Sequence, residues 1–343
     1  MRLLFVTQQV DPEHPALGAT VPKLVALAAR VDEVVVLADG AVPDALPANC
    51  RVRTFGARSK AGRGARFEAA LAAELRGLRG GAVVAHMCPI YAVLAAPLVR
   101  PLRIPLVLWY THWRGSGLLR AAERASTAVA SVDRRSFPLP SKKVRAIGHG
   151  IDLGEFSCVE RDGNGDGSLR ALALGRYSPA KGLDVVVHAV AATDVRLTVY
   201  GPTLTPLERE HRAILGQLVD ALGVGDRVRL EGPVPRARVP ELFGEADLLV
   251  NNMRAGAPDK VVYEAAASCL PVVASNPVFD ELLEPELRFA RDDPDELVAR
   301  LREFEARDAA ARREIGQRLR EKVAAHHSAE TWAEGILRAA GLR

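Results

Sequence analysis

The sequence predicts an α/β protein with two doubly wound domains, each built on a parallel sheet. Short apolar runs alternate along the chain with amphipathic segments, a pattern typical of βαβ units. The 343 residues are too many for one ordinary core, which favours two domains. A Gly- and Asp-rich stretch, CVERDGNGDGS (158–168), divides the apolar runs into two groups and is predicted to be the linker.

Apolar runs on both sides of this linker are predicted as strands, and ligands are expected at the carboxyl ends of those strands. Before the linker they are LLFVT (3–7), EVVVLA (33–38), AVVAHM (82–87), PLVLWYTH (105–112) and KVRAIG (143–148). After it they are LRALALG (169–175), VRLTVYG (195–201), RVRLEG (227–232), DLLVN (247–251) and PVVAS (271–275). Residues 295–343 are predicted to be mostly helical, with Trp332, Ile336 and Leu337 packing the last helix onto the body.

Composition indicates a globular protein, with 48% hydrophobic and 26% charged residues. The four cysteines, Cys50, Cys88, Cys158 and Cys269, are far apart and form no CxxC pair, so they are predicted to be reduced core residues. The opening MRLLFVTQQVD suits a first strand rather than a secretion signal, and the apolar stretch at 83–99 contains a histidine and two prolines. A cytoplasmic protein is therefore predicted.

One motif in the linker, D-x-N-x-D-G at 162–167, opens like a calcium loop. Its twelfth position is Ala173, where a bidentate glutamate is needed, and no helix is expected to flank it. Calcium is rejected on these grounds. The remaining sequence offers no convincing ligand cluster, so no metal site is predicted.

Charge is unevenly distributed between the two halves. Residues 1–150 hold 21 Lys and Arg against 10 Asp and Glu, whereas the remainder is acidic. The densest basic patch is GARSKAGRGAR (56–66), with Arg58, Lys60, Arg63 and Arg66. Two interpretations stay open for this patch: a solvated loop, or a contact for an anionic acceptor or an acidic membrane surface. Nucleic acid is disfavoured because no aromatic residues are interleaved with the charges.

The strongest local pattern is LALGRYSPAKGLDVVVHAV (172–190), in which a strand ends at Gly175. Ser178 and Pro179 are predicted to be the N-cap and first residue of the following helix. Arg176 and Lys181 then lie on the turn between strand and helix. Two cations beside a helix N-terminus are typical of a phosphate site, although surface charges that flank a turn would give the same pattern.

A second pattern is DKVVYEAAASCLPVVAS (259–275), where Glu264 stands in apolar surroundings. Its first half is predicted to be a short helix that begins near Asp259 and is closed by Pro271; its second half is predicted to be a buried strand. A buried carboxylate must be paired or bound to a ligand, because an unsatisfied buried charge costs several kcal/mol. The alternatives are a glutamate that reaches solvent or one that pairs with Arg254.

These stretches, with EGPVPRARVPELFGEADLLVN (231–251) and AIGHGID (146–152), resemble the C-terminal half of family 4 glycosyltransferases. VTQQVDPEHPALGATVPKLVALA and LWYTHW are similar to that family's opening loop and central histidine strand. The resemblance implies a retaining enzyme with the GT-B fold, two Rossmann-like domains and an interdomain cleft. It implies an acceptor-binding domain at 1–153, a nucleotide-sugar-binding domain at 154–325, and a last helix at 326–343 that packs back on the first domain.

The resemblance implies that Arg176 and Lys181 hold the diphosphate of a nucleotide-sugar donor. It implies that Glu264, the second glutamate of the family's E-x7-E pattern, accepts hydrogen bonds from the ribose hydroxyls, which would satisfy the buried carboxylate. His112, in WYTHW, matches the family histidine that faces the donor sugar. His86, in AHMCPIY, has either a cleft role or a structural role.

The sequence departs from the family at the first glutamate of the pattern, which falls at Gly256. Asp259 and Lys260 stand where the family has glycine and an apolar residue, so either could contact the sugar or phosphate. The amides of residues 256–260 are expected to face the diphosphate. Asp11 and Gly18 lie on the first loop, which the family uses near the phosphates and the acceptor.

The reaction implied is sugar transfer from a nucleoside diphosphate to a hydroxyl of a lipid-linked, cell-wall, polysaccharide or natural-product acceptor. The resemblance implies that it needs no metal or other cofactor. The main task is to stabilise the departing diphosphate. Two alternatives stay open: another reaction on the same fold, such as epimerisation or phosphorolysis, or a catalytically silent nucleotide-sugar-binding subunit. A dehydrogenase is disfavoured, because no G-x-G-x-x-G follows any strand.

Overall fold

The computed structural model describes residues 1–14, 17–42, 46–78, 80–159, 167–254, 256 and 258–342. The chain divides into two compact units, one made of Met1–Asp152 with His326–Arg343 and the other of Leu153–Ala325. The boundary between the two units therefore precedes the predicted linker at 158–168. Most of that linker, and with it the calcium-like motif, lies outside the described residues.

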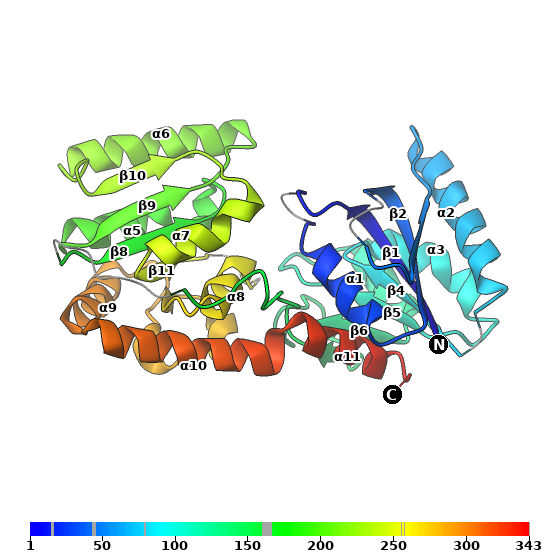
Figure 1. Ribbon diagram of the computed structural model, residues 1–343. Helices are drawn as coiled ribbons and strands as arrows, with labels where there is room; N and C mark the ends of the chain where they lie inside the picture. The colour runs from blue at the N-terminus through cyan, green and yellow to red at the C-terminus, as the bar shows by residue number, and fades with distance from the viewer. Residues whose placement is uncertain are drawn as a thin grey trace. The chain divides into compact units, whose positions relative to one another are not determined.

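The first unit is built on a sheet in which every described strand pair is parallel, with the order β3-β2-β1-β4-β5-β6-β7 (Figure 1). The strands are β1 (Arg2–Val10), β2 (Glu33–Ala41), β3 (Cys50–Thr54), β4 (Ala82–His86), β5 (Leu106–Trp109), β6 (Ala128–Ser131) and β7 (Val144–Ala146). The sequence analysis missed β3 and β6. β3 is an edge strand that alternates arginines with smaller residues, and β6 is a short run of small ones.

Helices cover both faces of this first sheet. They are α1 (Thr20–Ala28), α2 (Lys60–Leu75), α3 (Pro89–Val99), α4 (Gly117–Ala125) and α11 (Ala329–Ala339). Alternate residues of β1 point to opposite faces of the sheet. Leu4 and Val6 belong to the core formed with α2, α3 and α4. Phe5 points to the opposite face, where its ring lies 6.4 Å from that of Trp332 on α11. α11 packs against α1, β6 and β7.

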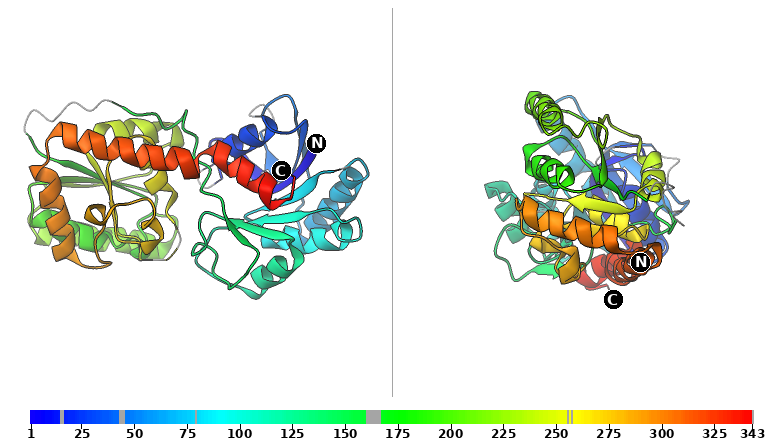
Figure 2. Two further views of the ribbon diagram at one scale, coloured as in Figure 1. Left: turned by 90° about the horizontal axis from the view of Figure 1, so that it is seen from below. Right: turned by 90° about the vertical axis from the view of Figure 1, so that its left-hand side faces the viewer.

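The second unit holds a five-stranded parallel sheet, in the order β10-β9-β8-β11-β12. Its strands are β8 (Arg170–Leu174), β9 (Arg196–Tyr200), β10 (Val228–Glu231), β11 (Leu248–Asn251) and β12 (Val272–Ala274). Its helices are α5 (Leu183–Ala191), α6 (Pro206–Ala221), α7 (Val239–Glu245), α8 (Lys260–Ala267), α9 (Pro294–Ala306) and α10 (Ala309–His327), the last of which ends in the first unit. α9, orange in Figure 2, packs on the green α5, whereas α8 packs on β11 and β12.

The second unit also contains a disulfide that was not expected. Cys158 and Cys269 are bonded, with their Cα atoms 4.9 Å apart, so the prediction that all four cysteines are reduced is wrong for this pair. Their separation of 111 residues hides the pairing from any local pattern. Cys50 and Cys88 are free.

No helix within the described ranges combines the length and the apolar character that crossing a membrane requires. The apolar stripe predicted for the last helix is confirmed: Trp332, Ile336 and Leu337 are all fully buried. The Trp332 ring lies 5.5 Å from that of Trp109 and 5.3 Å from the ammonium of Lys23.

Replacing Trp332 with alanine should lower the free energy of unfolding by about 3–5 kcal/mol, because it empties a buried site the size of an indole. The matched control is Trp113→Ala, since Trp113 is 44% exposed and its loss should change stability by about 0.5 kcal/mol or less. Urea unfolding followed by circular dichroism measures both. An equal loss in the two variants would contradict this account of the α11 interface.

Candidate functional site

The turn after β8 carries the two predicted phosphate-binding cations. Ser178 caps a single 3-10 turn, Pro179–Lys181, and α5 begins only at Leu183, so the predicted helix start is several residues too early. Gly175 and Gly182 make the turn feasible because both have positive φ, 139° and 55°. A Cβ at Gly175 would lie 2.6 Å from the Lys181 ammonium, so glycine is also what lets that side chain pass.

The Lys181 ammonium is held by a carboxylate in this structure. It pairs with Oδ2 of Asp259, which also accepts a hydrogen bond of 2.9 Å from the side-chain amide of Asn251. Asp259 is at the N-cap position of α8, yet its side chain makes no cap hydrogen bond there. The ends of β8 and β11 and the start of α8 therefore meet at this ion pair, with both side chains largely buried.

Arg176 has a different partner. Its Nη1 lies 3.0 Å from Oε1 of Glu208, and about half of the arginine side chain is exposed. Oε2 of Glu208 accepts backbone hydrogen bonds of 2.7 Å from Leu204 and 3.1 Å from Thr205, as part of the capping box that starts α6. Arg176 is thus joined to α6, whereas Lys181 is joined to α8.

Glu264 lies on α8, is 5% exposed, and is already paired. Its Oε1 lies 3.1 Å from Nη1 of Arg236 and 2.9 Å from Nζ of Lys260, one helical turn away. Of the two states expected for this buried carboxylate, paired or bound to a ligand, the structure shows the paired one. The alternative partner, Arg254, pairs with Asp184 and Asp292 instead.

Arg236 is the residue of this site that the sequence analysis missed. Its Nη2 donates a hydrogen bond of 2.7 Å to Glu155, and its guanidinium lies 5.4 Å from the centre of the Phe156 ring. Burial acts to lower the pKa of Arg236, but Glu264 and Glu155 outweigh it, and the pKa is raised. The only local signal was an arginine directly after V-P, at the entry to α7.

Arg254 has a structural role beside the cation turn. Its backbone N–H donates to the carbonyl of Ala180 at 2.7 Å, and its Nη1 donates to that of Pro179 at 3.0 Å. These bonds fix the backbone of the turn that carries Lys181. Gly256 lies nearby in sequence, is exposed, and has open space where a Cβ would stand.

The first unit holds the two predicted histidines. His112 follows β5 and is partly buried; its Nδ1 accepts a hydrogen bond of 3.0 Å from the Arg114 amide. Partial burial and then the Arg114 charge lower its pKa. His86, at the end of β4, is only 3% exposed, with Nδ1 3.3 Å from the Thr7 hydroxyl. Burial, and then the charge of Lys23, hold the pKa of His86 well below its usual value.

Of the remaining predicted positions, Asp11 and Gly18 lie on the first loop and the basic patch lies at the start of α2. Asp11 accepts a hydrogen bond of 2.9 Å from the Glu13 amide, and the Gly18 amide donates one of 2.9 Å to the carbonyl of His14. In the basic patch, Arg63 pairs with Asp39 at 2.6 Å and Arg66 donates to the carbonyl of Gly56. The other two, Arg58 and Lys60, are exposed beside the N-cap of α2.

The structure thus brings four predicted residues to the start of α8: Lys181, Asp259, Lys260 and Glu264. Each carboxylate of this group pairs with a cation, Asp259 with Lys181 and Glu264 with Lys260. In the part of the chain that the structure describes, no group of three His, Cys, Asp or Glu could hold a metal ion.

Comparisons with known proteins agree with this architecture. Residues 184–338 match a family model described as "Glycosyl transferase-like". The chain is 29% identical over 153 residues to a D-inositol 3-phosphate glycosyltransferase of Thermobifida fusca, and the match spans 39% of this chain and 34% of that relative.

Solved structures resemble the whole chain. Sucrose-phosphate synthase from Thermosynechococcus elongatus has a TM-score of 0.77 at 19% identity, covering 98% of this chain and 97% of that one. Anabaena HepE, solved in complex with UDP-glucose, has a TM-score of 0.76 at 19% identity, covering 99% of each chain. The predicted fold is confirmed: the chain has the two-domain GT-B fold of glycosyltransferases, and its residues 184–338 carry a glycosyl transferase-like sequence.

Proposed function

We propose that this chain is a glycosyltransferase that moves a sugar from a nucleoside-diphosphate sugar to an acceptor hydroxyl, with retention at the anomeric carbon. The observation that carries the proposal is the cluster at the start of α8, where Lys181 and Glu264 lie at the carboxyl edge of the second sheet. Ligands of parallel α/β sheets bind at this edge. The glycosyl transferase-like match at 184–338 and the UDP-glucose complex of HepE support the same donor class.

In this proposal the cations bind the diphosphate and Glu264 binds the ribose. Lys181 and Arg176 stabilise the charge that develops on the departing diphosphate, and preorganised charge of this kind is a large catalytic term. Glu264 accepts hydrogen bonds from the ribose through Oε2, because its two cations both contact Oε1. The leaving phosphate oxygen takes the acceptor proton, so the reaction requires neither a protein base nor a metal.

Either Asp259 or Lys260 takes over the contact of the glutamate that Gly256 replaces, with the sugar or with the phosphate. His112 is proposed to contact the sugar, Gly18 the phosphates and Asp11 the acceptor, whereas the burial of His86 favours its structural role. The exposed cations Arg58 and Lys60, with Arg63 and Arg66, would favour an anionic acceptor or an anionic membrane surface.

A second candidate function is a catalytically silent subunit that binds a nucleotide sugar. Two observations favour it: Gly256 stands in place of a sugar-contacting glutamate, and Lys181 is neutralised by Asp259. Incubating the purified chain with its donor distinguishes the two, because release of nucleoside diphosphate by the chain alone would exclude the silent subunit.

A panel of UDP, GDP, ADP, CDP and dTDP tests donor binding. One of them, at about 100 times its dissociation constant, should stabilise the protein by about 2.7 kcal/mol, seen as a rise in melting temperature. Lys181→Ala and Glu264→Gln should lose most of this rise. Lys322→Ala, which removes a pair with Glu284 elsewhere in the second unit, should keep it. Equal rises in all three variants would refute the proposed site.

Freeing Arg176 from Glu208 should strengthen nucleotide binding. Glu208→Gln removes the ion pair while a glutamine can still complete the capping box of α6. About half of the Arg176 side chain is exposed, although Glu208 is buried, so the pair should contribute about 1 kcal/mol and the dissociation constant for the nucleotide should fall by about fivefold. Calorimetric titration measures it. The control is Glu241→Gln, which breaks the exposed pair with Arg238; an equal gain in both variants would contradict a specific role for Arg176.

Asp259→Asn should separate binding from transfer. The variant frees Lys181, so the nucleoside diphosphate should bind more tightly, while the rate of sugar transfer should fall if Asp259 contacts the sugar. Initial rates with the complete donor and titration with the diphosphate alone provide the two values. A variant with unchanged affinity would show that the Lys181–Asp259 pair does not compete with the diphosphate.

A further inference from the structure

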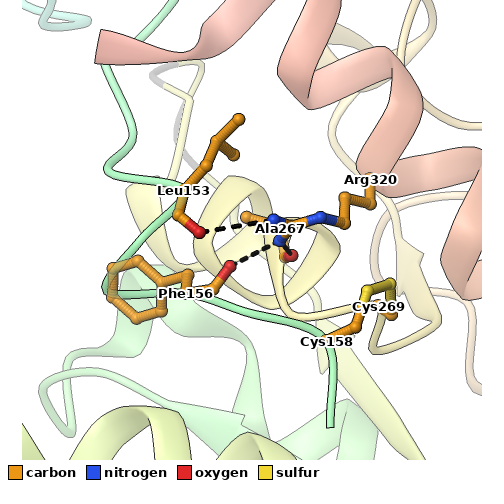
Figure 3. Close-up of a disulfide and its surroundings, with 6 residues drawn as sticks. All are labelled: Leu153, Phe156, Cys158, Ala267, Cys269 and Arg320. Atoms are coloured by element: carbon orange, nitrogen blue, oxygen red, sulfur yellow. Dashed lines mark hydrogen bonds between the residues drawn. A yellow bond between two sulfur atoms is a disulfide. The ribbon is translucent and has the colours of Figure 1, made fainter.

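The disulfide of the second unit connects two segments that both serve the candidate site. Cys158 follows the first segment, which carries Glu155 and Phe156, and Cys269 follows α8, which carries Glu264 (Figure 3). The Cα separation of 4.9 Å lies within the range that disulfides span without movement of the backbone.

The same two segments converge on Arg236. Its guanidinium contacts Glu155 at 2.7 Å and the Phe156 ring on one segment, and Glu264 at 3.1 Å on the other. The bridge therefore ties together, within a few residues on either side, the two backbones that position this buried guanidinium. Opening the bridge would remove the covalent tie between the segments that carry Glu155 and Glu264.

A second, non-covalent link spans the same two segments. Arg320 of α10 donates hydrogen bonds to the carbonyls of Leu153, at 3.3 Å, and Phe156, at 2.6 Å, and also to that of Ala267 at the end of α8 (Figure 3). This link does not depend on the sulfur atoms, so it should persist when the bridge is opened. Reduction should therefore loosen the cluster without unfolding the unit.

The two sulfurs differ in access. Cys158 is exposed, whereas Cys269 is 4% exposed and lies under α10, where a Cβ at Gly316 would lie 2.0 Å from the Cys269 carbonyl oxygen. A thiolate can thus attack the Cys158 sulfur and expel Cys269. The two free cysteines are poorer reactants, because burial raises the pKa of Cys50 and of Cys88 to about 11.

We propose that Cys158–Cys269 is a reversible redox modification site that controls the Arg236–Glu264 cluster and, resting on the proposed function, nucleotide affinity. In reduction, the thiolate of a small thiol bonds to the Cys158 sulfur, the bridge breaks, and Cys269 leaves as a thiolate that takes a proton. A second thiol attacks the mixed disulfide, which frees Cys158 and yields the small-molecule disulfide. Both electrons come from the two thiols.

The redox state is tested first by counting thiols in the denatured protein after equilibration with glutathione buffers. Oxidised protein should show only Cys50 and Cys88 reactive, and reduced protein all four cysteines. Oxidation should raise the melting temperature by about 5–10 °C, because the bridge closes a long loop. Cys158→Ser should behave as reduced protein in every buffer, whereas Cys50→Ser should respond normally. Four reactive thiols in fully oxidised buffer would overturn the proposal.

Coupling to the cluster is tested without any nucleotide. Arg236→Met removes the guanidinium that both bridged segments contact. The rise in melting temperature on oxidation should therefore be smaller in this variant than in the wild type. Arg238→Met is the matched control, since its exposed side chain pairs with Glu241 and Glu245, and it should keep the full shift. An unchanged shift in Arg236→Met would refute the coupling.

The nucleotide identified by the panel should bind about threefold or more tightly to oxidised than to reduced protein, a ratio absent in Cys158→Ser. Equal affinities in oxidised and reduced protein would show that the bridge does not control nucleotide binding. The bridge itself would remain established. If no nucleotide binds in either state, the proposed function fails, whereas the thiol count and the melting shifts still decide the redox site.

Discussion

Parallel strand pairing is the constraint on which the rest of this structure depends. Every described strand pair in both sheets is parallel, so the carboxyl ends of the strands in each sheet lie along one edge. That geometry brings Lys181, which follows β8, against Asp259, which follows β11, although 78 residues separate them. Helices can then fill both faces, and the charged residues of the candidate site meet where strands end.

Charge compensation in the second unit follows from burial at that edge. Lys181, Arg176 and Arg236 each pair with a carboxylate that is largely withdrawn from water, because a buried charge without a partner would cost several kcal/mol. A diphosphate that binds as proposed would therefore compete with Asp259 and Glu208 for these cations. Its affinity would then depend on the carboxylates as much as on the cations.

The sequence could predict what is local. Alternating apolar runs located the strands except β3 and β6, and the turn at 175–182 and the helix at 260–267 were found because their residues are contiguous. Arg236 was missed because its partners, Glu155 and Glu264, lie far away in sequence and no periodicity marks the contact. The disulfide was missed for the same reason, since tertiary structure alone brings Cys158 to Cys269.

Glu264 shows how tertiary structure supplies partners that the sequence does not reveal. Its apolar surroundings predict a carboxylate that is either paired or bound to a ligand, and Arg236 and Lys260 pair with it within the protein. Both cations contact Oε1, so positive charge is concentrated at one of the two carboxylate oxygens. A carboxylate held by two cations has few orientations left, so under the proposed function less ordering would remain for a ribose to impose. The same pairing thus explains how Glu264 is buried and fits the role proposed for it.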